Sequence, residues 1–295
     1  MKHLLLFIIS LFTVLWLTAQ EKSTHTYAIK GNDTLRLDIY TDKTIKKGHA
    51  KPVLLWMHGG GFSGGTRDNP AEVKLAEFAA KRGYIGVSIS YRLTRKDSLT
   101  GFGCDALASE KLRTFKMAVE DYMDAALFVV NNAKKFNIDT DKIIAGGSSA
   151  GAETVLNAVF MRPFFITNLT QYQKVRFRGL ISLAGAMVNA NYITAKNAVP
   201  SVFFHGTADN LVPYATAPHH CCKPEQPGYF ILDGAETIIK KFDELNTPYY
   251  FYTVIGGMHE VSGIPFYDLE NIFSFFEQSF KNDKSIQQKI YVDKK

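Results

Sequence analysis

The sequence predicts a mostly parallel α/β fold, with an antiparallel hairpin at its N-terminal end and helices on both faces of the twisted sheet. Two patterns predict it. Residues 26–30 and 35–40 alternate apolar and polar side chains on either side of Gly31-Asn32-Asp33, which is typical of a hairpin. From Pro52 onward, unbroken apolar runs alternate with helical stretches, as expected of strands that are buried on both faces of a parallel sheet.

The elements after the hairpin follow from these runs in chain order. We expect strands at residues 53–57, 84–90, 142–145, 179–183, 201–204 and 249–254. We expect helices at residues 71–81, 111–136, 150–161, 235–245 and 267–280. In such sheets, ligands and catalytic groups gather at the carboxyl ends of the strands, so the residues just after each strand are the candidate functional residues.

The first twenty residues have the features of a secretory signal. A basic start, Met1-Lys2-His3, is followed by apolar residues 4–17 and then by Thr18-Ala19-Gln20. The apolar run is shorter than the roughly 20 residues that span a bilayer. We therefore predict a signal peptide at 1–20, a single α/β domain at 21–295 and a secreted or periplasmic protein without a stable membrane span. An uncleaved membrane anchor is the alternative.

The charge pattern argues against a nucleic-acid partner. The formal net charge is +6, but the lysines are scattered, and their longest cluster, at 43–51, falls in a polar loop. We interpret them as a solvated surface rather than a basic binding face.

The three cysteines predict one disulfide and one free thiol. Export permits disulfides, and a ring between neighbouring cysteines is strained, so Cys104 is expected to pair with either Cys221 or Cys222. A metal site is the alternative use of His219-His220-Cys221-Cys222. Structural zinc sites usually space their ligands more widely, so we predict no metal and no organic cofactor.

A candidate nucleophile follows the predicted strand at 142–145. Gly147-x-Ser149-x-Gly151 is typical of a sharp strand-to-helix turn that exposes a serine hydroxyl at the start of a helix. A free serine is a poor nucleophile and requires a base. The alternative is a Gly/Ser turn that merely begins a helix. It is less favoured because the motif stands between a predicted strand and a predicted helix.

Three consecutive glycines follow the predicted strand at 53–57. In His58-Gly59-Gly60-Gly61-Phe62, glycine lets the backbone approach a ligand and direct its N–H groups at a developing negative charge. We predict an oxyanion hole formed by the N–H groups of Gly60, Gly61 and Ala150. His58 is expected to hold this loop by hydrogen bonds rather than to transfer protons.

An acid and a base follow two further predicted strands. Asp209 comes after the strand at 201–204 and His259 after the strand at 249–254, so that serine, aspartate and histidine appear in the order Ser149, Asp209, His259. We predict that His259 takes the proton of Ser149 and that Asp209 orients the imidazole. The other histidines are expected to be packed or solvated residues; they are His3, His25, His49, His205, His219 and His220.

At these motifs the sequence resembles the α/β-hydrolase superfamily over nearly the whole mature chain. The blocks 58–62 and 149–151 are shared with hormone-sensitive-lipase-like enzymes and carboxylesterases. Ser148 and the block 205–213 depart from the first group, and that block looks more like acetyl xylan and feruloyl esterase relatives and prolyl-oligopeptidase-type domains. The resemblance implies an exported serine carboxylesterase that forms an acyl-enzyme with small or carbohydrate-linked esters.

Two other functions remain as alternatives. One is a serine peptidase of prolyl-oligopeptidase type, although no propeller domain precedes the triad. The other is a non-catalytic binding protein on a hydrolase scaffold, although all three triad residues are present. Segments 93–110, 160–175 and 211–229 are expected to bound the substrate. Glu153, one turn beyond Ser149, either reaches the site or pairs with a neighbour, and the sequence favours pairing.

Overall fold

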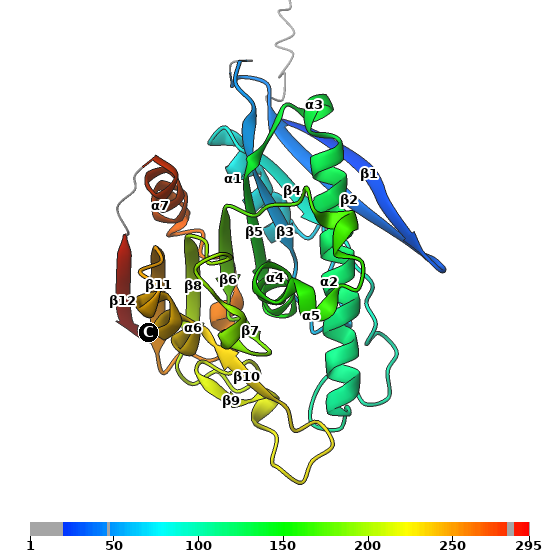
Figure 1. The fold of residues 1–295 in the computed structure, drawn as a ribbon, viewed down its shortest axis with the longest axis vertical. Helices are drawn as coiled ribbons and strands as arrows, with labels where there is room; N and C mark the ends of the chain where they lie inside the picture. Colours follow the sequence, from blue (N-terminus) through cyan, green and yellow to red (C-terminus); the bar gives the residue numbers. More distant parts are fainter. Residues whose placement is uncertain (1–19, 46–47, 282–285, 295) are drawn as a thin grey trace, which may run out of the picture.

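A single nine-stranded sheet organises the computed structural model of the chain, which describes residues 20–45, 48–281 and 286–294 (Figure 1). The strand order is β1-β2-β4-β3-β5-β6-β8-β11-β12. The predicted signal peptide lies outside the described residues except for Gln20, which begins β1. The mostly parallel sheet, the antiparallel N-terminal strands and the helices confirm the predicted α/β fold.

The N-terminal hairpin is longer than predicted. β1 (Gln20–Lys30) and β2 (Asp33–Asp42) pair antiparallel around a tight turn, and β2 also pairs antiparallel with β4 (Ile85–Ile89). Gly31 adopts φ +61° in the turn, a conformation that costs glycine little. The hairpin therefore attaches the start of the chain to the edge of the parallel sheet.

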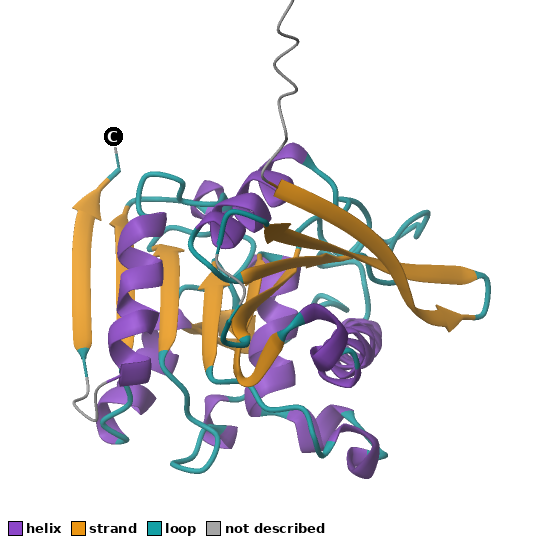
Figure 2. Cartoon of the chain, turned by 90° about the horizontal axis from the view of Figure 1, so that it is seen from above, coloured by secondary structure: helices purple, strands orange, loops and turns teal. Residues whose placement is uncertain are grey.

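The remaining strands of the main sheet run parallel to one another (Figure 2). The predicted strands among them are β3 (Lys51–Met57), β5 (Ile138–Ser148), β6 (Gly179–Leu183), β8 (Ser201–Gly206) and β11 (Tyr249–Ile255). Because these strands are parallel, their carboxyl ends lie at one edge of the sheet. The loops that follow β3, β5, β8 and β11 carry the four predicted motifs.

Helices cover both faces of the sheet, and a large hydrophobic core lies on each face. α1 (Pro70–Lys81) and α7 (Leu269–Lys281) pack over Trp56 and Phe204 on one face. The larger core on the other face includes residues of α2 (Ala108–Asn131), α4 (Ala150–Phe160) and α6 (Ala235–Glu244). Two one-turn helices, α3 (Ala133–Phe136) and α5 (Arg162–Phe165), follow α2 and α4.

The prediction of a single helix at 111–136 is wrong at its C-terminal end, because Asn132 separates α2 from α3. The backbone of Asn132 leaves the helical region, with φ −103° and ψ 13°, and its side-chain amide donates to the Phe128 carbonyl at 2.9 Å. The side chain thus satisfies a carbonyl at the end of α2, which is a common way for a helix to end.

Several short elements were not predicted. β12 (Gln287–Asp293) pairs parallel with β11 at the edge of the main sheet. A separate small sheet contains β7 (Ala186–Met187), β10 (Ile231–Gly234) and β9 (Thr216–Pro218). Four 3₁₀ turns complete the described elements: η1 (Leu169–Tyr172), η2 (Ala190–Tyr192), η3 (His219–Cys221) and η4 (His259–Ser262).

A disulfide joins Cys104 to Cys222 across 118 residues of sequence, and Cys221 is an exposed free thiol. This decides between the two predicted pairings. His220 and Cys221 both adopt left-handed backbone angles, with φ 58° and 54°, and thereby turn the chain so that the second cysteine of the pair faces Cys104.

Across the described ranges, no helix is both long enough and apolar enough to cross a bilayer.

Candidate active site

Ser149 lies on a strained turn between β5 and α4. Its backbone adopts φ 51° and ψ −121°, a combination that residues with a side chain rarely adopt and that costs of order 1–3 kcal/mol. A Cβ atom at Gly147 would overlap the backbone of Gly151, and one at Gly151 would overlap the carbonyl oxygen of Met57. Only glycine therefore permits a turn this tight, and the turn presents the serine hydroxyl at the N-terminus of α4.

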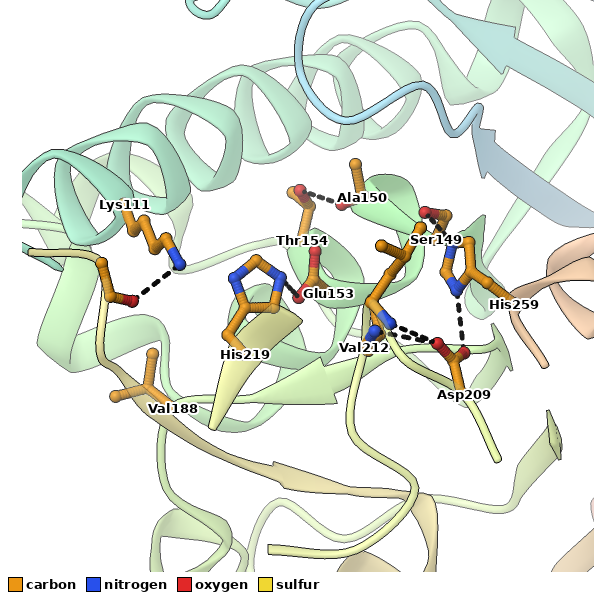
Figure 3. Close-up of polar contacts among 12 residues, drawn as sticks. Lys111, Ser149, Ala150, Glu153, Thr154, Val188, Asp209, Val212, His219 and His259 are labelled. Carbon is orange, nitrogen blue, oxygen red and sulfur yellow. Dashed lines mark hydrogen bonds and ion pairs between the residues drawn. The ribbon is translucent and has the colours of Figure 1, made fainter. Parts of the chain in front are cut away.

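The structure joins Ser149, His259 and Asp209 in one hydrogen-bonded chain (Figure 3). The Oγ atom of Ser149 lies 2.7 Å from Nε2 of His259, and Nδ1 of His259 lies 2.8 Å from Oδ2 of Asp209. With the proton on Nδ1, the imidazole leaves Nε2 as an acceptor for the serine hydroxyl. The three residues come from the loops after β5, β8 and β11, as the sequence predicts.

Asp209 is held as an anion by several donors. The backbone N–H groups of Leu211 and Val212 donate to its Oδ1 at 2.9 and 3.0 Å. Burial alone would raise the pKa of the carboxyl, but the contacts with His205 and His259 outweigh it and hold the pKa well below its usual range. The carboxylate therefore stays ionised and can stabilise positive charge on His259.

The loops that carry Asp209 and His259 contact each other directly. The N–H groups of Thr207 and Ala208 donate to the carbonyls of Val254 and Gly257 at 3.0 and 2.9 Å. A Cβ atom at Gly206 would overlap the Gly257 carbonyl. The acid and the base are therefore positioned against one another through the backbone.

The glycine loop after β3 lies against the nucleophile turn. Gly60 and Gly61 adopt φ +115° and +59°, and a Cβ atom at Gly60 would overlap the Gly64 carbonyl. No described residue accepts a hydrogen bond from the N–H groups of Gly60, Gly61 or Ala150. These three donors, all on residues that line one cavity with Ser149, are free to bind an anionic oxygen.

His58 contacts its own loop, as expected. Its Nδ1 lies 2.7 Å from the Gly59 carbonyl oxygen, and its ring packs on Tyr91 with ring centres 4.5 Å apart. Burial lowers the pKa of His58, so the neutral form is favoured. The hydroxyl of Tyr91 donates to the carbonyl of His58 at 3.2 Å. These contacts fix the backbone from which the glycines extend.

A cavity of about 320 Å³ opens at Ser149 and His259. Its other walls come from the glycine loop, the nucleophile turn and α4, the segment after β8 and two further loops. The wall residues beyond the glycine loop are Phe102, Ser148, Ala150, Glu153, Leu211, Val212, His219, His220 and Ser262. Two of the three predicted substrate-bounding segments, 93–110 and 211–229, contribute to it. The third does not, because no residue of 160–175 lines this cavity.

Glu153 lies in the cavity wall and pairs with a neighbour, so both parts of the open prediction apply. Its Oε1 lies 3.2 Å from Nε2 of His219, and both side chains are almost fully buried. Burial raises the pKa of Glu153 to about 8 and holds the pKa of His219 well below its usual range. His219 is packed, as expected, but it lines the candidate site.

Sequence reasoning missed the contact of His205 with Asp209. His205 is fully buried, and its Nε2 lies 3.4 Å from Oδ2 of Asp209 and 3.1 Å from the Val212 carbonyl oxygen. Its position four residues before the aspartate was the available signal.

In the described part of the chain, no three His, Cys, Asp or Glu side chains are arranged to hold a metal ion, and the sulfur of Cys222 is engaged in the disulfide.

The parallel sheet, the strained serine turn and the Ser149, His259, Asp209 arrangement are the features of the α/β-hydrolase fold. Residues 37–178 match the model of the BD-FAE family. The match covers a little under half of the chain, and together with the similarity to esterases and lipases it confirms the predicted resemblance to carboxylesterases and to acetyl xylan and feruloyl esterases.

Individual relatives agree with this assignment. The chain is 31% identical over 141 residues to secreted lipase 5 of Gibberella zeae, covering 45% of this chain and 25% of that protein. It is 32% identical over 126 residues to fumonisin B1 esterase of Sphingopyxis macrogoltabida, covering 42% and 22%. The chain thus spans about a quarter of the length of these relatives.

A solved structure extends the likeness to the whole fold. Butyrate-bound esterase 2 of Thermogutta terrifontis superposes with a TM-score of 0.61 at 17% identity, covering 88% of this chain and 92% of that one. At this identity, the superposition establishes the shared fold.

Proposed function

We propose that the protein is an exported serine carboxylesterase that hydrolyses small or carbohydrate-linked carboxylic esters. The observation that carries the proposal is the hydrogen-bonded chain from Ser149 Oγ through His259 to Asp209, with contacts of 2.7 and 2.8 Å. Relatives that are named as esterases support the hydrolysis of an ester bond. The cavity of about 320 Å³ suits a small substrate group.

The reaction proceeds in two steps. His259 Nε2 accepts the hydroxyl proton as Ser149 Oγ bonds to the ester carbonyl carbon, and the carbonyl oxygen becomes negative. The N–H groups of Gly60, Gly61 and Ala150 stabilise that oxygen. When the intermediate collapses, the protonated His259 gives its proton to the leaving alcohol, and an acyl group remains on Ser149.

Water completes the cycle by the same route in reverse. His259 takes a proton from the water as the water oxygen attacks the acyl carbon. It then returns the proton to Ser149 Oγ as the acid leaves. Asp209 stabilises the imidazolium at both steps without itself accepting the proton.

Export is part of the proposal and rests on the N-terminal sequence and on the Cys104–Cys222 disulfide, since disulfides persist in oxidising compartments. We expect the mature protein to begin near residue 21 and to be found outside the cytoplasm. Mass spectrometry of the N-terminus, with cell fractionation, tests this. Recovery of the intact chain from the cytoplasm would contradict export and leave the esterase proposal standing.

The esterase proposal is tested with two adjacent serines. Purified protein should hydrolyse p-nitrophenyl acetate and butyrate, and Ser149→Ala should lower kcat by several orders of magnitude, since removal of a triad member commonly does. Ser148→Ala is the matched control. It removes only a hydroxyl that donates to the Ser262 carbonyl at 2.7 Å, and should retain at least about a tenth of the activity. Equal hydrolysis by the parent and Ser149→Ala would refute the assignment.

A further inference from the structure

We propose that Glu153 and His219 form a specificity site that binds a free hydroxyl group of the ester substrate beside Ser149. This inference rests on the proposed esterase function and specifies which esters the enzyme prefers. The hydroxyl belongs either to the acyl part or to the alcohol part of the ester, and the experiment below separates the two.

The first reason is that both side chains are buried in the wall of the reaction cavity, where they contact each other but three of their polar atoms have no described hydrogen-bond partner. Glu153 is 2% exposed and His219 is fully buried. Although their nearest atoms are 3.2 Å apart, that contact lacks hydrogen-bond geometry, and Glu153 Oε1 and both His219 ring nitrogens have no described hydrogen-bond partner. Buried polar groups nearly always have partners, so this arrangement calls for one supplied by a ligand.

The second reason is their position. Glu153 follows Ser149 by one turn of α4, and Figure 3 shows its side chain between His219 and the Ser149–His259 pair. Glu153, His219 and Ser149 line the same cavity. A substrate group bound by the pair would therefore be close to the ester carbon that Ser149 attacks.

The third reason is that the pair is electrically neutral. Burial raises the pKa of Glu153 to about 8 and keeps the pKa of His219 low, so near neutral pH the acid is protonated and the ring is uncharged. Each then offers one donor and at least one acceptor. A hydroxyl, which both donates and accepts, matches such a pair, whereas a carboxylate or ammonium group would find no counter-charge.

A buried lysine on α2 does not reverse this balance, because burial raises the pKa of Glu153 more than the lysine lowers it. Lys111, on α2, donates its ammonium to the Gly228 carbonyl at 2.8 Å and does not line the cavity. It instead fixes the segment that follows His219, as the Cys104–Cys222 disulfide also does. The ring of Phe102 packs edge-on against His219 with centres 5.2 Å apart. The pair is thus held in place before a substrate arrives.

The test compares esters that differ only by a hydroxyl in place of a methyl group. For the acyl side, the pair is p-nitrophenyl 3-hydroxybutyrate and p-nitrophenyl 3-methylbutyrate. For the alcohol side, it is 2-hydroxyethyl acetate and propyl acetate. We expect the parent to favour the hydroxyl member of one pair by roughly tenfold or more in kcat/KM, as sites built to bind a hydroxyl do.

Variants assign that preference to Glu153. Glu153→Leu keeps similar bulk without polar atoms and should bring the ratio close to one. Glu153→Gln retains a donor and an acceptor and should keep part of the preference. Thr154→Val is the matched control: its buried hydroxyl donates to the Ala150 carbonyl at 2.8 Å and does not line the cavity, so the ratio should be unchanged.

Each outcome is decisive. A parent ratio near one in both substrate pairs overturns the inference without any variant, and leaves the esterase proposal intact if the esters are hydrolysed. An unchanged preference in Glu153→Leu also overturns it. If the parent hydrolyses none of the four esters faster than Ser149→Ala does, the proposed function fails and the inference fails with it.

Discussion

Opening the Cys104–Cys222 disulfide should destabilise the protein strongly, and Cys104→Ala is the substitution that opens it cleanly. Removing Cys222 instead would leave Cys104 free to pair with Cys221, the adjacent thiol. With the bonded cysteines 118 positions apart in the sequence, the loop-closure relation gives an entropy change of about 16 cal/mol/K, which is about 5 kcal/mol at 25 °C. That is a large fraction of the 5–15 kcal/mol by which typical domains are stable.

Urea unfolding followed by tryptophan fluorescence measures the effect, because Trp56 is buried in the core and reports its exposure. We expect Cys104→Ala to lower the free energy of unfolding by about 3–5 kcal/mol. Cys221→Ala is the control, since it removes an exposed thiol that closes no loop, and its midpoint should match that of the parent. If Cys104→Ala unfolded within about 1 kcal/mol of the parent, the loop-closure reasoning would be refuted.

Three further predictions concern the site. Asp209→Asn should lower kcat by roughly 10⁴-fold with little change in KM, because an amide no longer selects the imidazole tautomer that Ser149 needs; a tenfold loss or less in steady-state assays would contradict the triad. Gly60→Ala should lower kcat by about 10²-fold or more, since the backbone cannot keep φ +115° and the N–H group moves; unchanged kcat would argue against an oxyanion role. Glu153, whose folded pKa of about 8 exceeds its ordinary 4.5, contributes stability that is fully present below pH 4.5 and lost as the pH rises through 8. Between about pH 5 and pH 9, the free energy of unfolding should therefore fall less for Glu153→Gln than for the parent, with a difference of up to about 5 kcal/mol. Urea unfolding at a series of pH values measures it, and parallel pH profiles of the two proteins would exclude a buried neutral acid.

The parts of the fold that the sequence predicts well are those with a dense local signal. β6 was predicted at its observed bounds because all five of its residues are apolar or small and are buried on both faces. The candidate triad residues can be picked out in the sequence because each follows such a strand. β12, in contrast, consists of exposed and half-buried residues, and it pairs with β11, which lies 38 residues earlier in the sequence. No local pattern encodes that partner.

Other features depend on tertiary contacts alone. The choice of Cys222 over Cys221 follows from two left-handed residues, His220 and Cys221, neither of which is a glycine that would mark the turn. The burial of Glu153 and His219 against one another joins α4 to a loop sixty-six residues later, and a carboxylate one turn after a serine resembles an ordinary surface residue until that loop is in place. Site residues that act through packing are therefore less visible in sequence than those that belong to a motif.

The direct backbone contact between the loops of Asp209 and His259 limits how this enzyme can diversify. Adding or deleting a residue in either loop would displace the partner loop, since Gly206 and Gly257 leave no room between them. Lineages of this architecture should accordingly keep both loop lengths fixed and acquire new substrates through changes at 93–110 and 211–229. Those two segments supply cavity walls, and apart from Leu211 and Val212, whose N–H groups donate to Asp209, they lie outside the contact between the two loops.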